Sequence, residues 1–387
     1  MHIRRRAIVM LEPRERLDFD LSLVAAGGSG LRSTLEWFAL APPRDAEIAV
    51  TPQEALLLGA LSPTQWVDFD ELARAHACAI LESLLAKELI VVQGSPAATR
   101  DDALRDTHWR NPAAVQHYSS RWRGVDTEAI QKDLAENDAG DLLAKLGAAP
   151  PHVREHVDAP ARIALSHVES SVLDTLLARR VTCRNFDRTR ALTHEQFSSV
   201  LYRAWGARAV QDFAPDVPLL KKGVPSAGGL HATEAYLLVQ YVEDIAPGLY
   251  HYHPIDHALE PIQTLSAAEA AALARKFVAA QPYFVDAHVM VIAVSRFRRN
   301  FWKYRNHAKA YRALILDVGH LSQTQYLAAT ELGLAAFITA AINEVDIEQA
   351  FGLDPIEESP LAVTGFGIRA AARREVEWDP LHAVWPA

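Results

Sequence analysis

The chain has 387 residues, of which 50% are hydrophobic and 22% charged, and its formal net charge is −9 at pH 7. This balance is typical of a globular protein, and the length fits two domains or one large domain with an appendage. The acidic excess argues against a general nucleic-acid binder. Two cysteines, Cys78 and Cys183, cannot build a disulfide framework or a cysteine-based zinc site. No stretch approaches the roughly 20 apolar residues of a membrane span, so we expect a soluble cytoplasmic protein.

The first 93 residues carry the signals of a small compact domain. Thr51 and Glu54 form the pattern of a capping box, with proline at the first helical position. The predicted elements are strands at 7–11, 17–23 and 89–92, and helices beginning at Pro52 and spanning 69–77 and 79–87. Three short helices and a strand resemble a winged helix and, in pattern, the leader-peptide recognition domains attached to peptide-modifying enzymes. A plain helical packing module is the alternative. For residues 94–160 we predict a helical linker.

Residues 161–387 alternate between helical and strand patterns. Thr193 and Gln196 form a second capping box, whose helix runs to Trp205. The other predicted elements are strands at 235–242, 248–252, 258–262, 289–294 and 361–366 and helices at 265–280, 309–332 and 344–351. Strands interleaved with helices indicate an α+β or α/β layered fold.

Two short segments carry the strongest chemical signal. In Arg180-Val-Thr182-Cys-Arg184, two guanidinium groups and a hydroxyl stand at alternate positions, which point the same way in an extended chain. Three donors on one side suit a phosphate or another anion. In Pro225-Ser-Ala-Gly-Gly229, small residues let the backbone approach a flat ligand closely. Together these segments predict a phosphorylated, planar cofactor.

The same segments carry a family resemblance that covers about residues 165–370. The first resembles the opening motif of flavin-dependent nitroreductases. The second, continued to Tyr236, resembles the SagB-type azoline dehydrogenases, which mature ribosomal peptides. Further agreeing segments are Gly248–Tyr252, Lys303-Tyr304 with Tyr311-Arg312, Asp317–His320, and Gly333-Leu334 through Leu353. The resemblance implies an α+β, nitroreductase-like fold, a central and mainly antiparallel sheet flanked by helices, and a homodimer with FMN at the subunit interface.

By this resemblance, individual residues acquire expected roles around FMN. Arg180 and Thr182 would hold the phosphate, and Arg184 would lie near the pyrimidine edge, where a cation stabilises the reduced ring. The residues expected to pack on the flavin, from the partner subunit, are Pro225, Ser226, Ala227, Gly228 and Gly229. The Ala340-Ala341 backbone would face the N5 edge, where many nitroreductases have Glu-Gly. The basic residues that could complete the phosphate site are Arg369, Arg373 and Arg374.

The resemblance also implies that Lys303 and Tyr304 are the catalytic pair. Oxidation of an azoline to an azole removes a Cα proton and a hydride, and the hydride goes to flavin N5. A lysine whose pKa is lowered by burial could accept the proton, while Tyr304 could orient the ring. The alternative is a surface ion pair for Lys303 and a half-buried core position for Tyr304.

Other side chains allow different interpretations. His251 and His253 would share one face of a strand, with His257 nearby, but no carboxylate completes a metal set, so we expect no metal. Cys183 is expected to be packed rather than nucleophilic. The run 297–304 mixes aromatic and basic residues and could bind nucleic acid. We favour a lid or substrate-facing loop near the flavin instead.

Three hypotheses follow. The first is an FMN-dependent dehydrogenase that oxidises azolines in a ribosomal precursor peptide, acts beside a cyclodehydratase, and binds the leader through its N-terminal domain. The second is a small-molecule nitro or quinone reductase that uses a nicotinamide donor. The third is a peptide-binding protein with a vestigial flavin site.

Overall fold

The computed structural model describes residues 1–134 and 139–386, which divide into two compact units. The first unit comprises Met1–Arg121, Ser295–Leu316 and Glu348–Ser359. The second comprises Trp122–Val294, Asp317–Ile347 and Pro360–Ala387. The predicted domain limits at residues 93 and 160 stay predictions. No helix among the described residues is long and apolar enough to cross a membrane.

The first unit contains two small sheets and short helices around one core. The sheet of order β5-β1-β6 is built from β1 (His2–Arg5), β5 (Val67–Asp68) and β6 (Ile90–Val92). The sheet of order β2-β3-β4 is built from β2 (Met10–Phe19), β3 (Leu31–Leu40) and β4 (Ile48–Val50). The helices α2 (Pro52–Ala60), α3 (Phe69–Ala75) and α4 (Cys78–Ala86) confirm the three predicted helices. Leu58, Leu81 and Leu84 are fully buried in the shared core.

Local signals explain where α2 begins. The Thr51 hydroxyl accepts a hydrogen bond from the Glu54 amide at 3.2 Å, and the Glu54 carboxylate accepts one from the Thr51 amide at 2.6 Å. This reciprocal pair is the predicted capping box, and Pro52 occupies the first turn.

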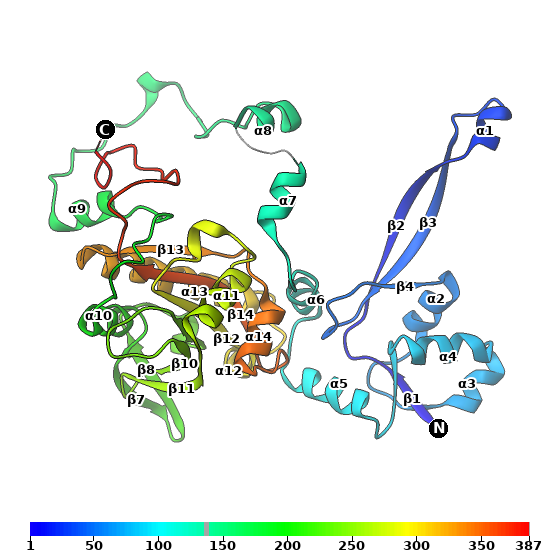
Figure 1. Ribbon diagram of the computed structural model, residues 1–387. Helices are drawn as coiled ribbons and strands as arrows, with labels where there is room; N and C mark the ends of the chain where they lie inside the picture. The colour runs from blue at the N-terminus through cyan, green and yellow to red at the C-terminus, as the bar shows by residue number, and fades with distance from the viewer. Residues whose placement is uncertain (135–138, 387) are drawn as a thin grey trace. The chain divides into compact units, whose positions relative to one another are not determined.

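The strands expected at 7–11 and 17–23 are wrong. The chain instead forms one long strand, β2, which pairs with β3 from Met10↔Leu40 to Phe19↔Leu31, with the short helix α1 (Leu21–Ala25) near the hairpin tip (Figure 1). Ion pairs explain why a charged sequence forms a strand: Arg16 contacts Glu36 across the hairpin at 3.2 Å. Asp20 then ends the strand by capping α1 through the Ser22 amide.

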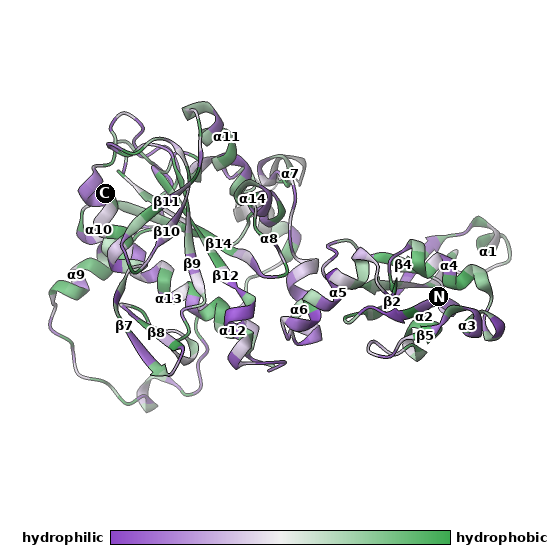
Figure 2. Ribbon diagram, turned by 90° about the horizontal axis from the view of Figure 1, so that it is seen from below, coloured by the Kyte–Doolittle hydropathy of each residue, from purple (hydrophilic) through white to green (hydrophobic). Residues whose placement is uncertain are grey.

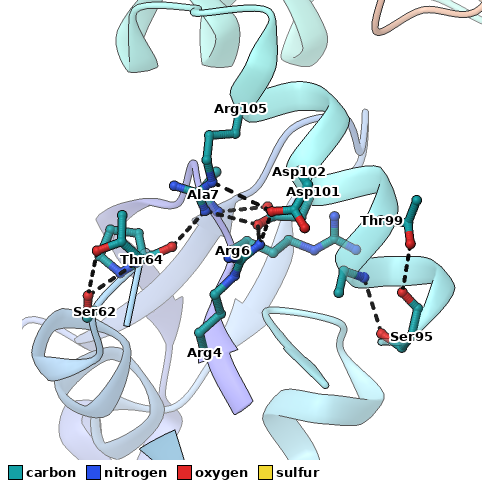
Figure 3. Close-up of polar contacts among 12 residues, drawn as sticks. Arg4, Arg6, Ala7, Ser62, Thr64, Ser95, Thr99, Asp101, Asp102 and Arg105 are labelled. Carbon is teal, nitrogen blue, oxygen red and sulfur yellow. Dashed lines mark hydrogen bonds and ion pairs between the residues drawn. The ribbon is translucent and has the colours of Figure 1, made fainter. Parts of the chain in front are cut away.

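A buried carboxylate joins the start of the chain to α5 (Pro96–Asp106). Asp101 is fully buried and accepts hydrogen bonds from Arg4 at 3.1 Å, Arg105 at 3.2 Å and the Ala7 amide at 2.7 Å (Figure 3). Because a buried carboxylate needs such partners, these contacts fix β1 against α5. The helices α6 (Asn111–Ser119) and α12 (Phe297–Lys303) belong to the same unit.

The second unit is organised around a six-stranded sheet of order β11-β10-β9-β12-β14-β13. The strands are β9 (Thr233–Val239), β10 (Gly248–His253), β11 (Ala258–Thr264), β12 (Val289–Arg296), β13 (Ala335–Thr339) and β14 (Glu358–Gly367). The pairs β10–β11, β10–β9 and β13–β14 are antiparallel. Hydrophobic residues concentrate in β12 and β14, and all but the last residue of β12 are buried (Figure 2). The α+β prediction is confirmed.

Helices complete this unit. Those wholly within it are α7 (Thr127–Leu134), α8 (Ala139–Leu146), α9 (Val172–Arg179), α10 (His194–Ala204) and α11 (Ala267–Phe277). The helices α13 (Ala310–Glu331) and α14 (Glu344–Phe351) each begin or end in the first unit, which includes residues 310–316 and 348–351. The predicted Thr193–Gln196 capping box starts α10. Its buried residues Phe197 and Leu201 join a core with Val291 and Phe366 of the sheet.

Some elements within residues 161–387 differ from the sequence prediction. The sequence did not indicate β13 or the hairpin of β7 (Ala207–Ala214) and β8 (Val217–Lys222). Most of β7 is exposed, so it lacks the alternation of buried and exposed residues that identifies a strand. The segment expected as a loop at 297–304 is mostly the helix α12.

Candidate functional site

The Arg180–Arg184 segment runs beside β13 in an extended form. Thr182 forms a parallel bridge with Ala336, and the Cys183 amide donates to the Ala336 carbonyl at 2.9 Å. The Thr182 hydroxyl lies 3.0 Å from the Tyr326 hydroxyl. The Arg180 guanidinium lies 5.5 Å from the centre of the same Tyr326 ring. Tyr326, which the sequence did not single out, therefore brings these two predicted phosphate ligands together.

Arg184 is held differently from Arg180 and Thr182. Its side chain is exposed, its guanidinium donates to the Val376 carbonyl at 3.1 Å, and it lies 4.9 Å from the Tyr283 ring centre. A cavity of about 550 Å³ opens beside it, lined in part by Asp187, Arg188 and Arg374. The predicted cation at the ring edge is thus engaged by the C-terminal part of the chain.

Residues 374–385, which we call the C-terminal clamp, contact Arg184 and Asn185 through the buried carboxylate of Glu377. Glu377 accepts hydrogen bonds from the Arg184 amide at 2.6 Å, from Asn185 at 2.8 Å and from the Trp385 indole at 2.8 Å, and it pairs with Arg369. Burial tends to raise the pKa of Glu377, but these donors outweigh burial and lower it.

Asn185 and Asp379 add further contacts to the clamp. The Asn185 side-chain oxygen accepts from the Arg374 and Glu375 amides at 2.7 and 2.8 Å. Asp379 accepts from the amides of Ala383, Val384 and Trp385, the last at 2.8 Å. Arg369, predicted as a phosphate ligand, is placed by this network against Glu377.

The Pro225–Gly229 segment is fixed by a carboxylate from α13. Asp317 accepts from the Ser226 hydroxyl at 2.6 Å and from the Ala227 amide at 3.2 Å. The Ser226 oxygen in turn accepts from the His231 amide at 3.0 Å. Gly228 and Gly229 have φ angles of 61° and 70°, a region that favours glycine. These contacts give the Asp317 motif a structural role that the sequence alone did not reveal.

The Ala340-Ala341 turn follows β13 directly. The Ala341 amide donates to the Thr339 hydroxyl at 3.1 Å, and the Ala341 carbonyl accepts from the Gln281 side chain at 2.8 Å. Ala340 is exposed. Gln281, a second residue that the sequence did not single out, therefore sets the direction of this backbone.

Lys303 and Tyr304 lie at the end of α12, in the first unit, whereas the predicted cofactor residues lie in the second. Phe297 and Phe301 are one helical turn apart, and each ring centre lies 4.6 Å from that of Trp109. This packing is the reason that the segment is a helix rather than a loop. Lys303 is exposed, and its ammonium lies 5.7 Å from the Tyr304 ring centre. The structure thus places the predicted base at the surface of the first unit.

A cluster of ionisable groups lies near the start of β9. The His251 ring contacts Glu234 at 3.1 Å and Glu260 at 2.6 Å. The hydrogen bond to Glu234 raises the pKa of His251, with a smaller contribution from Glu260, although burial opposes the shift. The sequence did not indicate that two carboxylates would lie beside His251. Still, no group of three or more His, Cys, Asp or Glu residues within the described ranges could hold a metal ion.

Lys222, at the end of β8, is a buried member of the same region. It is 3% exposed, and burial lowers its pKa to about 8, while the charge of Glu234 opposes that shift. Sequence reasoning missed this lysine because nothing in Lys221-Lys222 distinguishes a buried lysine from its exposed neighbour. Cys183 is fully buried, and burial raises its pKa to about 12, as expected for a packed thiol.

Comparison with known proteins finds a family match in the second half of the sequence. Residues 177–368 match the model described as the Nitroreductase family. The trifolitoxin-processing protein TfxB of Rhizobium leguminosarum bv. trifolii is 32% identical over 144 residues, which cover 37% of this chain and 38% of that protein. The microcin B17-processing protein McbC of Escherichia coli is 27% identical over 167 residues, 40% of this chain and 57% of that protein. The matches thus span less than two thirds of either processing protein.

Two other similarities extend the comparison. MJ1384 of Methanocaldococcus jannaschii, named as a nitroreductase, is 28% identical over 205 residues, which cover 53% of this chain and 95% of that protein. Among solved structures, a chain of the E. coli microcin synthetase McbBCD complex with truncated pro-MccB17 bound aligns with a TM-score of 0.48 and 20% identity, covering 69% of this chain and 97% of that chain.

Proposed function

Residues 177–368 of this chain belong to the nitroreductase family, and on that premise we propose that the protein is an FMN-dependent dehydrogenase that oxidises azolines to azoles in a ribosomally made peptide. The observation that carries the proposal is the similarity to two peptide-processing proteins, TfxB and McbC. The Lys303-Tyr304 pair adds support, because this pair is the one that the resemblance to the SagB-type dehydrogenases assigns to catalysis.

The residues of the second unit fit a flavin mononucleotide. Arg180 and Thr182 would hold the phosphate, since both contact Tyr326 and supply donors to an anion. The positive φ angles of Gly228 and Gly229 leave backbone without side chains where a flat ring would pack. Asp317 would keep this segment in place through Ser226. We further propose that the protein is a homodimer, as the family resemblance implies.

In the proposed reaction, the cofactor and the side chains of the protein would have separate tasks. Bound FMN would supply a hydride acceptor. Lys303 would accept the Cα proton at its Nζ atom, and Tyr304 would orient the heterocycle. Because Lys303 is exposed in this chain, the bound peptide or the second subunit would have to shield it from water during the reaction.

We also propose that the first unit binds the leader of the precursor peptide and that a cyclodehydratase acts in the same complex. The physical support is the compact set of α2, α3 and α4 beside the β2–β3 hairpin, an arrangement compatible with a winged helix. A second candidate function, small-molecule nitro reduction, is favoured by the match to MJ1384, which covers 95% of that protein.

The two candidates are separated by one experiment. Purified protein is incubated in air with FMN and an azoline-bearing peptide, and the peptide mass is followed. With the wild-type protein, we expect each azoline ring of the peptide to lose one proton and one hydride. Lys303→Ala should abolish this loss and leave FMN binding unchanged. Wild-type turnover by Lys303→Ala would refute the base assignment. Rapid NADPH oxidation with a nitroarene, together with no change in the peptide, would favour the reductase.

A further inference from the structure

The segment that carries Lys303 is basic, although the chain as a whole is acidic. The sequence has 39 Lys and Arg residues against 48 Asp and Glu residues, yet residues 296–316 hold seven Lys or Arg residues and no Asp or Glu residue. The whole of this segment belongs to the first unit. Such a concentration of positive charge attracts anionic groups from solution.

Arginines of this segment gather at one cavity. A cavity of about 380 Å³ is lined by three arginines and two glutamates of the first unit, Arg296, Arg298, Arg299, Glu357 and Glu358. We call it the arginine cavity. The Phe297 amide donates to the Glu357 carbonyl at 2.8 Å, which holds the start of α12 against this part of the chain. The arginine cavity therefore has a fixed wall and one more guanidinium than carboxylates.

The ion pair at the arginine cavity lies at the surface. Arg298 contacts Glu357 at 2.9 Å, and the two side chains are 54% and 40% exposed. Exposed ion pairs of this kind are weak, because water solvates both groups. A carboxylate from a ligand can therefore join or replace Glu357 at little cost, and guanidinium groups bind carboxylates through two parallel hydrogen bonds. The arginine cavity thus suits an acidic side chain better than a neutral one.

The helix α12 connects the arginine cavity to the proposed reaction. Phe297 and Phe301 are on its buried face, whereas Arg299 and Lys303 lie four positions apart on another face. Residues four apart on a helix have Cβ atoms about 5–6 Å from each other. An extended peptide advances about 3.3 Å per residue, so this separation corresponds to about two residues of bound peptide. A peptide whose ring lies at Lys303 would place a side chain two residues away at the arginine cavity.

We propose that the arginine cavity binds an acidic side chain of the peptide substrate, about two residues from the azoline ring, and that Arg299 determines this preference. The inference rests on the proposed function and adds a substrate class to it, an azoline peptide with Asp or Glu near the ring. An acidic side chain suits this protein better than a nucleic acid, because the net charge of −9 repels a long polyanion far more than a single carboxylate.

The test uses short fluorescent azoline peptides without a leader, which differ only in Glu, Gln or Lys at the second residue on either side of the ring. Their dissociation constants for the full-length protein with FMN are measured by anisotropy. We expect the wild type to bind a Glu peptide about fivefold or more tightly than its Gln counterpart, and less selectively at high salt. Arg299→Gln should abolish this difference, and Arg299→Glu should reverse it in favour of the Lys peptide. Lys221→Gln removes an exposed cation in the second unit and should keep the wild-type preference.

Arg298→Gln provides a second variant at the surface of the arginine cavity and should weaken the preference for Glu in part. The inference is overturned if the wild type binds all three peptides equally, or if Arg299→Gln keeps the preference. It is also overturned if both Gln variants lose affinity for a single-stranded oligonucleotide but not for the Glu peptide. Oxidation of the same peptides, followed by mass, is a separate readout. Preferential binding of the Glu peptide without oxidation would support the arginine cavity and refute the proposed azoline oxidation alone.

Discussion

At the residue scale, the side chains that organise the site are carboxylates with several donors. Glu377 and Asp317 each accept at least two hydrogen bonds and each fix a backbone segment that the sequence identifies as cofactor-binding. Neither role could be predicted from the sequence, because Glu377 lies 193 positions from Arg184 and Asp317 lies 91 positions from Ser226. The motif residues were predictable from local spacing, whereas the residues that position them depend on long-range folding.

Glu377→Gln should show how much the C-terminal clamp contributes. The substitution leaves Arg369 without its anionic partner, and loss of one member of a buried ion pair costs about 3 kcal/mol or more. We expect the free energy of unfolding to fall by roughly this amount and the FMN affinity to weaken, as measured by denaturant titration and flavin fluorescence. Glu375→Gln is the matched control, because its exposed side chain lies outside the network.

The lowered pKa of Glu377 predicts that the stability of the folded chain depends on pH. The pKa of Glu377 is lowered in the folded chain, so its contribution to stability is present above the ordinary glutamate pKa of about 4.3. That contribution is lost as the pH falls through the lowered folded value. The stability difference between the wild type and Glu377→Gln should therefore be largest near neutral pH and shrink in acid. A difference that grows in acid would contradict the assignment.

At the element scale, local signals decided which predictions were confirmed. The capping boxes at Thr51 and Thr193 fixed the starts of α2 and α10, because cap and partner lie within one helical turn. The strand β2 was mispredicted because its stability depends on ion pairs with β3, such as Arg16–Glu36, which a single strand does not reveal. The helix α12 was missed because its aromatic residues pack on Trp109, far away in the sequence.

Phe301→Ala tests whether that packing holds α12. Phe301 is 1% exposed, and its ring lies 4.6 Å from Trp109, so truncation leaves a cavity in the first unit. We expect a loss of about 3 kcal/mol in the free energy of unfolding. Peptide oxidation should decline with it, because Lys303 and Tyr304 end this helix, whereas FMN affinity should be retained.

The control for this variant is Trp302→Ala, whose side chain is 47% exposed on the same helix. Its effect on the free energy of unfolding should be small. Equal destabilisation by both substitutions would show that Phe301 does not anchor the helix.

At the scale of the whole molecule, the chain interleaves two units along its sequence. The family match covers residues 177–368, yet Ser295–Leu316 and Glu348–Ser359 within it belong to the first compact unit. The strand and helix pattern predicted an α+β or α/β layered fold, and the family resemblance implied its central sheet. Neither predicted this interleaving, because the pattern of each segment does not say which core it joins.

The measurement that tests the central claim most directly is a titration of FMN into apoprotein, read by flavin fluorescence and combined with sedimentation to give the oligomeric state. The account predicts saturable binding of one FMN per chain in a dimer. It also predicts loss of binding in Arg180→Glu, where a carboxylate would replace the cation beside Tyr326 and repel the phosphate. A monomer that leaves added FMN unbound, or an Arg180→Glu variant with unchanged affinity, would contradict the account.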